Sequence, residues 1–263
     1  MKLGLFGGGF KPFTTGHFAK LARAIEDSDT VYLFYGLQER TPPKMGKRGK
    51  PLKSQQKFRT IGRSGRLYTP EVSREIFNIY EGAIERELKT VEVESTIGST
   101  PMRRIFEIVE EFAKNPDLYE KVTIYGAEDT IRNYLRKISY FGNLIETGKV
   151  QLGAIAPESA NDYLDEERLM DIIAQSEESS ITALRSYYPN TSQEDLERMQ
   201  RIRGTEVRDI ASTEEGIEEA KRFLPPFLND DEKGEVIDLL LGRGSSPMTE
   251  NHLRYFIRGI IRG

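Results

Sequence analysis

The chain has 263 residues, 37% of them hydrophobic, which is enough for one large or two small domains with a buried core. Its 38 basic and 42 acidic side chains give a formal net charge of -4, so the whole chain is not a polyanion binder and any basic surface must be local. Cysteine is absent, which excludes disulfide scaffolds and thiolate metal sites, and no apolar run reaches the length of a membrane span.

Apolar runs rich in β-branched and aromatic residues alternate with helix-like stretches through the first part of the chain. Five strands are predicted, at 3–6, 30–35, 90–93, 122–125 and 150–155. Helices are predicted between them, at 18–25, 73–88 with Ser73 as N-cap, 101–112 and 130–137. Strands and helices that alternate at this spacing indicate βαβ units, and therefore a doubly wound α/β fold with a parallel five-stranded sheet.

The pattern changes after residue 156. The stretch from 157 to 200 is polar, has helix-like segments and contains no convincing strand, so it is interpreted as a helical insertion into an α/β core at 1–156. The core is expected to resume at 201–224. A helical tail follows at 225–263, broken by the loop "GRGSSP" at 242–247.

A glycine-rich turn follows the first predicted strand, in the stretch "LFGGGFKPFTTGHF". Glycines at this point let the backbone approach a phosphate closely, and Gly16 allows the same where the next helix begins. The start of that helix would add unpaired N–H groups, His17 a ring donor and Thr14 a hydroxyl. Ligands of open α/β sheets bind beyond the carboxyl ends of the strands, where this turn and Gly126 fall. The sequence therefore predicts an anion site, the alternative being a turn capped by a histidine.

The order of these features resembles the nucleotidylyltransferase superfamily. Its first signature, (H/T)xGH, is matched by Thr14, Gly16 and His17, and its second, of the form ISSTxxR, by Gly204, Thr205 and Arg208 in "RIRGTEVRDI". The resemblance covers about 1–156 and 201–224 and implies a Rossmann-like nucleotidylyltransferase fold. Lys11 and Arg203 stand where many members have other residues, as does Gly204.

The resemblance implies roles for particular residues. Thr14, His17 and Arg208 would be catalytic. The residues expected to bind the nucleotide and its phosphates are Gly7, Gly8, Gly9, Phe10, Lys11, Gly16, Gly126, Glu128, Gly204 and Thr205. Glu128 is assigned from "IYGAEDT", in which Asp129 is the other candidate for an acid that lines the nucleotide pocket.

The chemistry implied is transfer of a nucleoside monophosphate to a phosphate-bearing small molecule, with release of pyrophosphate. The attacking phosphate oxygen is already ionised, so catalysis consists of positioning and charge neutralisation without a general base. Mg²⁺ would be held mainly by the substrate phosphates, and no protein metal site is predicted. The Gly-Thr-x-x-Arg form looks closer to adenylyltransferases than to cytidylyltransferases, so ATP is favoured over CTP, and the acceptor stays open.

The segment 40–66 contains ten basic residues and no acid. It leaves the second strand beside the predicted phosphate site and is interpreted as a lid over the polyphosphate. The candidate lid residues are Lys44, Lys47, Arg48, Lys50 and Lys53. A nucleic-acid contact through the same segment is the alternative, and with it a non-catalytic nucleotide- or nucleic-acid-binding protein on the same fold.

Three further features of the sequence bear on function and location. "KMGKR" at 44–48 resembles the lysine loop of class I aminoacyl-tRNA synthetases, but in that family the loop comes after the sheet, so this reading is not preferred. His252 is interpreted as structural, in a tail helix whose apolar face packs on a neighbour in the same chain or another, which leaves oligomeric state open. The amino terminus lacks the regions of a signal peptide, so a cytoplasmic protein without a membrane partner is expected.

Overall fold

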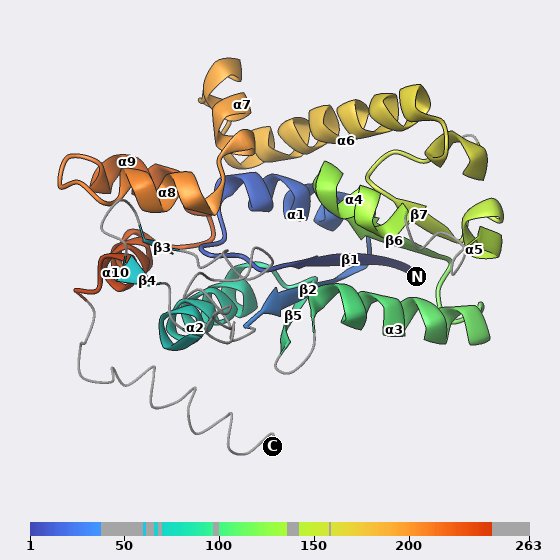
Figure 1. Cartoon of the computed structure of the whole chain (residues 1–263), viewed down its shortest axis with the longest axis horizontal. Helices are drawn as coiled ribbons and strands as arrows, with labels where there is room; N and C mark the ends of the chain where they lie inside the picture. The colour runs from blue at the N-terminus through green and yellow to red at the C-terminus, as the bar shows by residue number, and fades with distance from the viewer. Residues whose placement is uncertain are drawn as a thin grey trace, which may run out of the picture.

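The fold is known from a computed structural model, which describes residues 1–37, 60–61, 66–67, 70–96, 100–135, 142–157 and 159–243. A five-stranded sheet lies at its centre, with the order β5-β2-β1-β6-β7 and every neighbouring pair parallel (Figure 1). Its strands are β1 (Lys2–Gly8), β2 (Thr30–Gly36), β5 (Val91–Thr96), β6 (Lys121–Tyr125) and β7 (Val150–Leu152).

Helices cover both faces of this sheet. Those that connect its strands are α1 (Thr15–Asp27), α2 (Pro70–Glu87), α3 (Pro101–Lys114), α4 (Glu128–Leu135) and α5 (Gly142–Glu146). The helices α1 and α2 share a core with Leu33 of β2, whereas α3 packs on the other face against Leu3 and Leu5 of β1. Right-handed connections require this division, because the strand order runs outward from β1 and then returns to β6. The structure confirms the predicted doubly wound α/β fold.

The chain after β7 is helical in the part that the structure describes. Its elements are the 3₁₀ helix η4 (Ala160–Tyr163), α6 (Glu166–Tyr187), α7 (Gln193–Arg201), α8 (Gly204–Ile210), α9 (Ile217–Arg222) and α10 (Asp230–Leu241). The helices α6 and α7 contact α1 and form a further layer outside it (Figure 1). No helix within these described residues is both long and apolar enough to cross a bilayer.

Some predicted boundaries are wrong for identifiable reasons. Ser73 is not an N-cap, because α2 begins at Pro70, where the fixed φ of proline suits a first helical residue, and Ser73 is buried within the helix. The strand predicted to reach residue 155 ends at Leu152, since Gly153 follows with a φ of 84° that strands do not adopt.

Several sequence predictions concern residues outside the described part of the chain. They are the candidate lid residues Lys44, Lys47, Arg48, Lys50 and Lys53, and His252 of the tail. At the end of the basic segment 40–66 the structure describes β3 (Thr60–Ile61) and β4 (Arg66–Leu67), which pair antiparallel and were not predicted.

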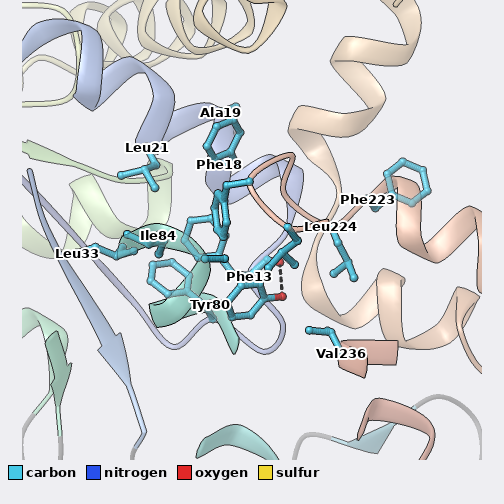
Figure 2. Close-up of a cluster of buried hydrophobic side chains, with 14 of the residues drawn as sticks. Phe13, Phe18, Ala19, Leu21, Leu33, Tyr80, Ile84, Phe223, Leu224 and Val236 are labelled. Carbon is cyan, nitrogen blue, oxygen red and sulfur yellow. Dashed lines mark hydrogen bonds between the residues drawn. The ribbon is translucent and has the colours of Figure 1, made fainter. Parts of the chain in front are cut away.

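The core holds the turn that leads into α1. Figure 2 shows Phe13 of this turn together with Phe18 of α1, Tyr80 of α2 and Val236 of α10 in one buried cluster. The Tyr80 hydroxyl donates a hydrogen bond of 2.9 Å to the Phe13 carbonyl oxygen (Figure 2). Because Phe13 precedes Thr14 directly, core packing fixes the backbone on which the first motif depends.

Candidate active site

A cleft of about 680 Å³ lies where the strand order reverses, between β1 and β6. Its walls come from the end of β1 and the turn after it, the loop after β6 and the start of α4, the first turns of α1, one residue of α6, and the chain from the end of α7 into α8. Residues that directly follow parallel strands gather at the carboxyl edge of a sheet, and a reversal of strand order opens a crevice there. The cleft therefore occupies the place where folds of this type bind ligands.

Most of the predicted site residues meet at this cleft. Those that line it are Gly7, Gly8, Gly9, Phe10, Lys11, Gly16, His17, Gly204, Thr205 and Arg208. Three predicted residues do not line it: Thr14, Gly126 and Glu128. Lining residues that the sequence did not assign to the site include Lys20, Asp129, Thr130, Glu177, Gln200, Arg201 and Arg203.

His17 lies on the first turn of α1, and its ring orientation is fixed by its neighbours. The backbone N–H of Thr14 donates to His17 Nδ1 over 3.0 Å, so Nδ1 accepts and carries no proton. The rings of Phe10 and Phe13 pack against the imidazole, with centroids 4.9 Å and 5.4 Å away. In the neutral imidazole the proton is therefore on Nε2, and a hydrogen-bond donor is held at the wall of the cleft.

Thr14 does not offer its hydroxyl to a ligand, contrary to the sequence prediction. Its side chain is fully buried, and its hydroxyl donates to the carbonyl oxygen of Ile202 over 3.2 Å. The same hydroxyl lies 2.9 Å from the unprotonated Nδ1 of His17, so its single proton has two acceptors within reach, the Ile202 carbonyl oxygen and this nitrogen. Thr14 is thus a positioning residue that joins the start of α1 to the segment before α8 and orients the histidine.

The amide groups at the start of α1 are also more occupied than expected. Thr15 N donates to the Phe223 carbonyl oxygen over 2.8 Å, and His17 N donates to the Thr14 carbonyl oxygen over 3.0 Å. These groups were expected to point unpaired at an anion, but chain segments around the turn accept their hydrogen bonds. Attraction of an anion to this cleft consequently depends more on side chains than on the helix terminus.

Arg208 connects the second motif to the first. Arg208 is almost fully buried, yet it lines the cleft. One guanidinium nitrogen donates to the carbonyl oxygens of Lys11, 197 residues away in sequence, and Gly204, the latter over 3.0 Å. The other donates to the Thr205 hydroxyl over 3.2 Å. These contacts hold a permanent positive charge beside the glycine-rich turn.

Two glycines allow the motifs to approach one another. A Cβ on Gly204 would lie 2.6 Å from the Lys11 carbonyl oxygen, and a Cβ on Gly16 would lie 2.4 Å from the Gln200 carbonyl oxygen. Both neighbours are backbone atoms, which cannot rotate away as a side chain can. Close packing of the two motif segments therefore explains these glycines, whereas the sequence interpretation had assigned them to phosphate contact.

The acid on the loop after β6 is also reassigned. Glu128 pairs with Arg132 of its own helix over 2.7 Å, and it lines a small cavity beside the cleft, together with Gly126. Asp129 is the acid that lines the cleft itself. The two residues are adjacent on the first turn of α4, so their side chains point in different directions, and the geometry favours Asp129, the other candidate from the sequence.

Lys20 and Glu177 face both the cleft and that small cavity. Burial lowers the pKa of the Lys20 ammonium, and the nearby carboxylate of Glu177 acts in the opposite direction. Lys20 follows His17 by three positions on α1, so helical spacing alone could have indicated that both face the same ligand. Nothing in the sequence could place Glu177 there, because its position depends on how α6 packs on α1.

Charge in the cleft is strongly one-sided. Among its described lining residues are five basic side chains, those of Lys11, Lys20, Arg201, Arg203 and Arg208. The same described lining has two carboxylates, on Asp129 and Glu177, and Arg201 also pairs with Glu197 over 3.5 Å, whereas the whole chain is slightly acidic. A local excess of positive charge in a concave site raises the concentration of anions there. The arrangement is suited to a ligand with several negative charges.

Comparisons with known proteins add little to this picture. No protein-family model matches the chain, and no curated protein matches it. Among solved structures, the chain is similar to a bifunctional NMN adenylyltransferase/ADP ribose pyrophosphatase from Francisella tularensis, with 14% identity and a TM-score of 0.33. The match covers 84% of this chain and 55% of that one, so this chain spans about half the length of that protein.

Proposed function

We propose that the chain is a nucleotidylyltransferase, which transfers a nucleoside monophosphate from a nucleoside triphosphate to a phosphate-bearing small molecule. One observation carries this proposal: two motif segments far apart in sequence meet at the sheet's switch point and form a basic cleft around His17 and Arg208. The sequences of both segments also resemble the signatures of that superfamily. The nucleotide is proposed to be ATP rather than CTP on the form of the second motif alone.

In this reaction an oxygen of the acceptor phosphate forms a bond to the α-phosphorus. The bond from the α-phosphorus to the oxygen that bridges it to the β-phosphate breaks, and pyrophosphate leaves with that oxygen and its electron pair. The attacking oxygen is already ionised, so no group of the protein needs to remove a proton. The protein must hold two anions in line and neutralise the charge that develops between them.

The described residues can supply these functions. His17 Nε2–H would donate to a non-bridging oxygen of the α-phosphate, because Thr14 holds the ring in the required tautomer. Arg208 and Lys11 both line the cleft, and their positive charges would neutralise the leaving pyrophosphate. Neither role requires a residue to change its protonation state during the reaction.

Mg²⁺ would enter with the triphosphate in this proposal. Among the described residues no group of three or more histidine or acidic side chains forms a metal cage. Mg²⁺ keeps several waters and is commonly bound through substrate phosphates and one or two carboxylates, and Asp129 and Glu177 are the carboxylates that line the cleft. The ion would supply further charge neutralisation at the phosphates.

The test is release of pyrophosphate by the full chain. ATP and CTP are each supplied with Mg²⁺ and a panel of phosphate monoesters that includes nicotinamide mononucleotide, phosphopantetheine and sugar phosphates. The proposal predicts acceptor-dependent release that His17→Ala abolishes or strongly reduces. If nucleotide binds but no acceptor gives release, the chain is a non-catalytic nucleotide-binding protein, which is the alternative that the sequence left open.

A further inference from the structure

Lys20 is an unusual lysine. Its side chain is mostly buried between α1 and α6, and with the residues that the structure describes its ammonium makes no hydrogen bond and no ion pair. Glu177 is its charged neighbour, but their charged atoms are not within the 4.0 Å of a salt bridge. By contrast, Arg23, one turn further along α1, pairs with Glu26 and Asp27 at 3.2 Å and 2.6 Å.

A desolvated positive charge without a close partner lowers the stability of a fold. Burial lowers the pKa of Lys20, which agrees with such a cost. Lys20 is also part of the cleft wall and lies on the same face of α1 as His17, one turn further from the start of the helix. A buried ammonium at the wall of a ligand cleft is explained if the ligand supplies the negative group that pairs with it.

The position of Lys20 relative to the other cations indicates which negative group that is. The guanidinium of Arg208 donates to the Lys11 carbonyl oxygen in the turn before α1, His17 is on the first turn of α1, and Lys20 follows on the second. In an in-line transfer the attacking and leaving oxygens lie on opposite sides of the α-phosphorus. If the pyrophosphate leaves on the side of Arg208 and the α-phosphate is at His17, the attacking phosphate comes from the side of Lys20.

We infer that Lys20 forms a second anion site in the cleft, which binds the phosphate group of the acceptor while the triphosphate occupies the site at His17 and Arg208. This inference rests on the proposed function. It assigns the acceptor to the phosphate monoesters or phosphonates, whose charge Lys20 would neutralise as two anions are brought together. The carboxylate of Glu177 limits the affinity of this site for a free anion.

The experiment uses two probes that do not require the substrates to be known. Tripolyphosphate occupies the triphosphate site whatever the base, and inorganic phosphate represents the reacting group of the acceptor. Calorimetry on the full chain is expected to show that phosphate still binds when tripolyphosphate is saturating. Lys20→Met is expected to weaken phosphate binding about tenfold or more, with tripolyphosphate binding changed much less.

Three variants make this result specific. Glu177→Gln removes the carboxylate beside Lys20 and should tighten phosphate binding, which is the opposite direction. Lys20→Arg keeps the charge and should restore part of the affinity. Lys121→Met is the matched control, because burial also lowers the pKa of Lys121, yet it begins β6 at the opposite end of the strand from the cleft and should change neither affinity.

The outcomes separate this inference from the proposed function. If tripolyphosphate displaces phosphate, or if phosphate binds Lys20→Met as tightly as the parent, there is no second site at Lys20 and the inference is overturned. If phosphate binding depends on Lys20 but tripolyphosphate does not bind, the anion site stands and the proposed triphosphate chemistry fails. Circular dichroism of each variant shows whether the fold is retained.

Discussion

Two concave sites of this molecule, a cleft and a groove, differ in the groups that contact their arginine side chains. The cleft at the switch point has about 680 Å³, and a groove beside α3 at the β2–β5 side of the sheet has about 470 Å³. In the groove, Arg104 is paired with Glu94 at 3.1 Å and with Glu107 at 3.2 Å. In the cleft, the guanidinium of Arg208 donates hydrogen bonds to the carbonyl oxygens of Lys11 and Gly204 and to the Thr205 hydroxyl.

The balance of charge in the cleft and the groove also has opposite sign. The groove is lined by three carboxylates, those of Glu92, Glu94 and Glu111, and by one described cation, Arg104. Charged side chains along the outer strand β5 are a common protection of an open sheet edge, so these carboxylates have a structural explanation. We therefore expect anions to be attracted to the cleft and repelled by the groove.

The largest expected effect is that of His17→Ala. Loss of one oriented donor to the reacting phosphate is expected to lower kcat about a hundredfold or more, by analogy with removal of one oxyanion-hole donor. Arg104→Met in the groove is the control, and it should leave turnover within about twofold of the parent, because exposed ion pairs contribute little. Steady-state pyrophosphate release measures both, and an unaltered kcat in the histidine variant would contradict the role of His17.

A pair of glycine variants tests the contact between the two motifs. In Gly204→Ala the new Cβ would meet the Lys11 carbonyl at 2.6 Å, so the motifs must separate, at a cost of about 1–3 kcal/mol in the free energy of unfolding. Gly234→Ala in α10 has open space around its Cβ and should stabilise by about 0.5–1 kcal/mol, since alanine favours a helix. Urea unfolding of both variants should give shifts of opposite sign, and equal shifts would show that the motif contact is not tight.

Arg208→Lys tests whether geometry or charge alone matters in the cleft. Lysine keeps the positive charge but loses the planar fork that bonds Lys11, Gly204 and Thr205 at once, so tripolyphosphate affinity should fall about tenfold. Arg104→Lys makes the same change in the groove and should leave that affinity unchanged. Full retention of affinity in Arg208→Lys would reduce the role of Arg208 to a point charge.

Local signals in the sequence account for what it could predict. Both the fold and the first motif could be predicted, because the apolar run of β1, the glycines behind it and the start of α1 are neighbours in the chain. The burial of Thr14 could not be predicted, because its hydroxyl donates a hydrogen bond to the Ile202 carbonyl oxygen, 188 residues away in sequence. The same holds for Glu177, which reaches the cleft only because α6 packs on α1.

The smallest expected effect is on thermal stability. It tests whether burial of the Lys20 charge lowers the free energy of unfolding. The pKa of Lys20 is lowered in the folded chain, so between that value and 10.5 the unfolded chain binds more protons and stability rises with pH. Below the folded pKa both states carry the charge, and the cost of its burial is present in full. Lys20→Met removes this cost and should raise Tm at pH 7 by about 2–4 °C, as expected for roughly 1 kcal/mol in a chain of this size.

The gain should shrink as the pH approaches 10.5, because the parent then loses the buried charge as well. Glu177 is the charged neighbour of Lys20, so Glu177→Gln combined with Lys20→Met should show a smaller dependence of Tm on pH than Glu177→Gln alone. Calorimetric scans at pH 7 and at pH 10 measure the difference. A Lys20→Met variant that is less stable than the parent at pH 7 would mean that Lys20 supports the fold through its packing. The cleft would then no longer differ from the groove in keeping a buried charge at a cost in stability.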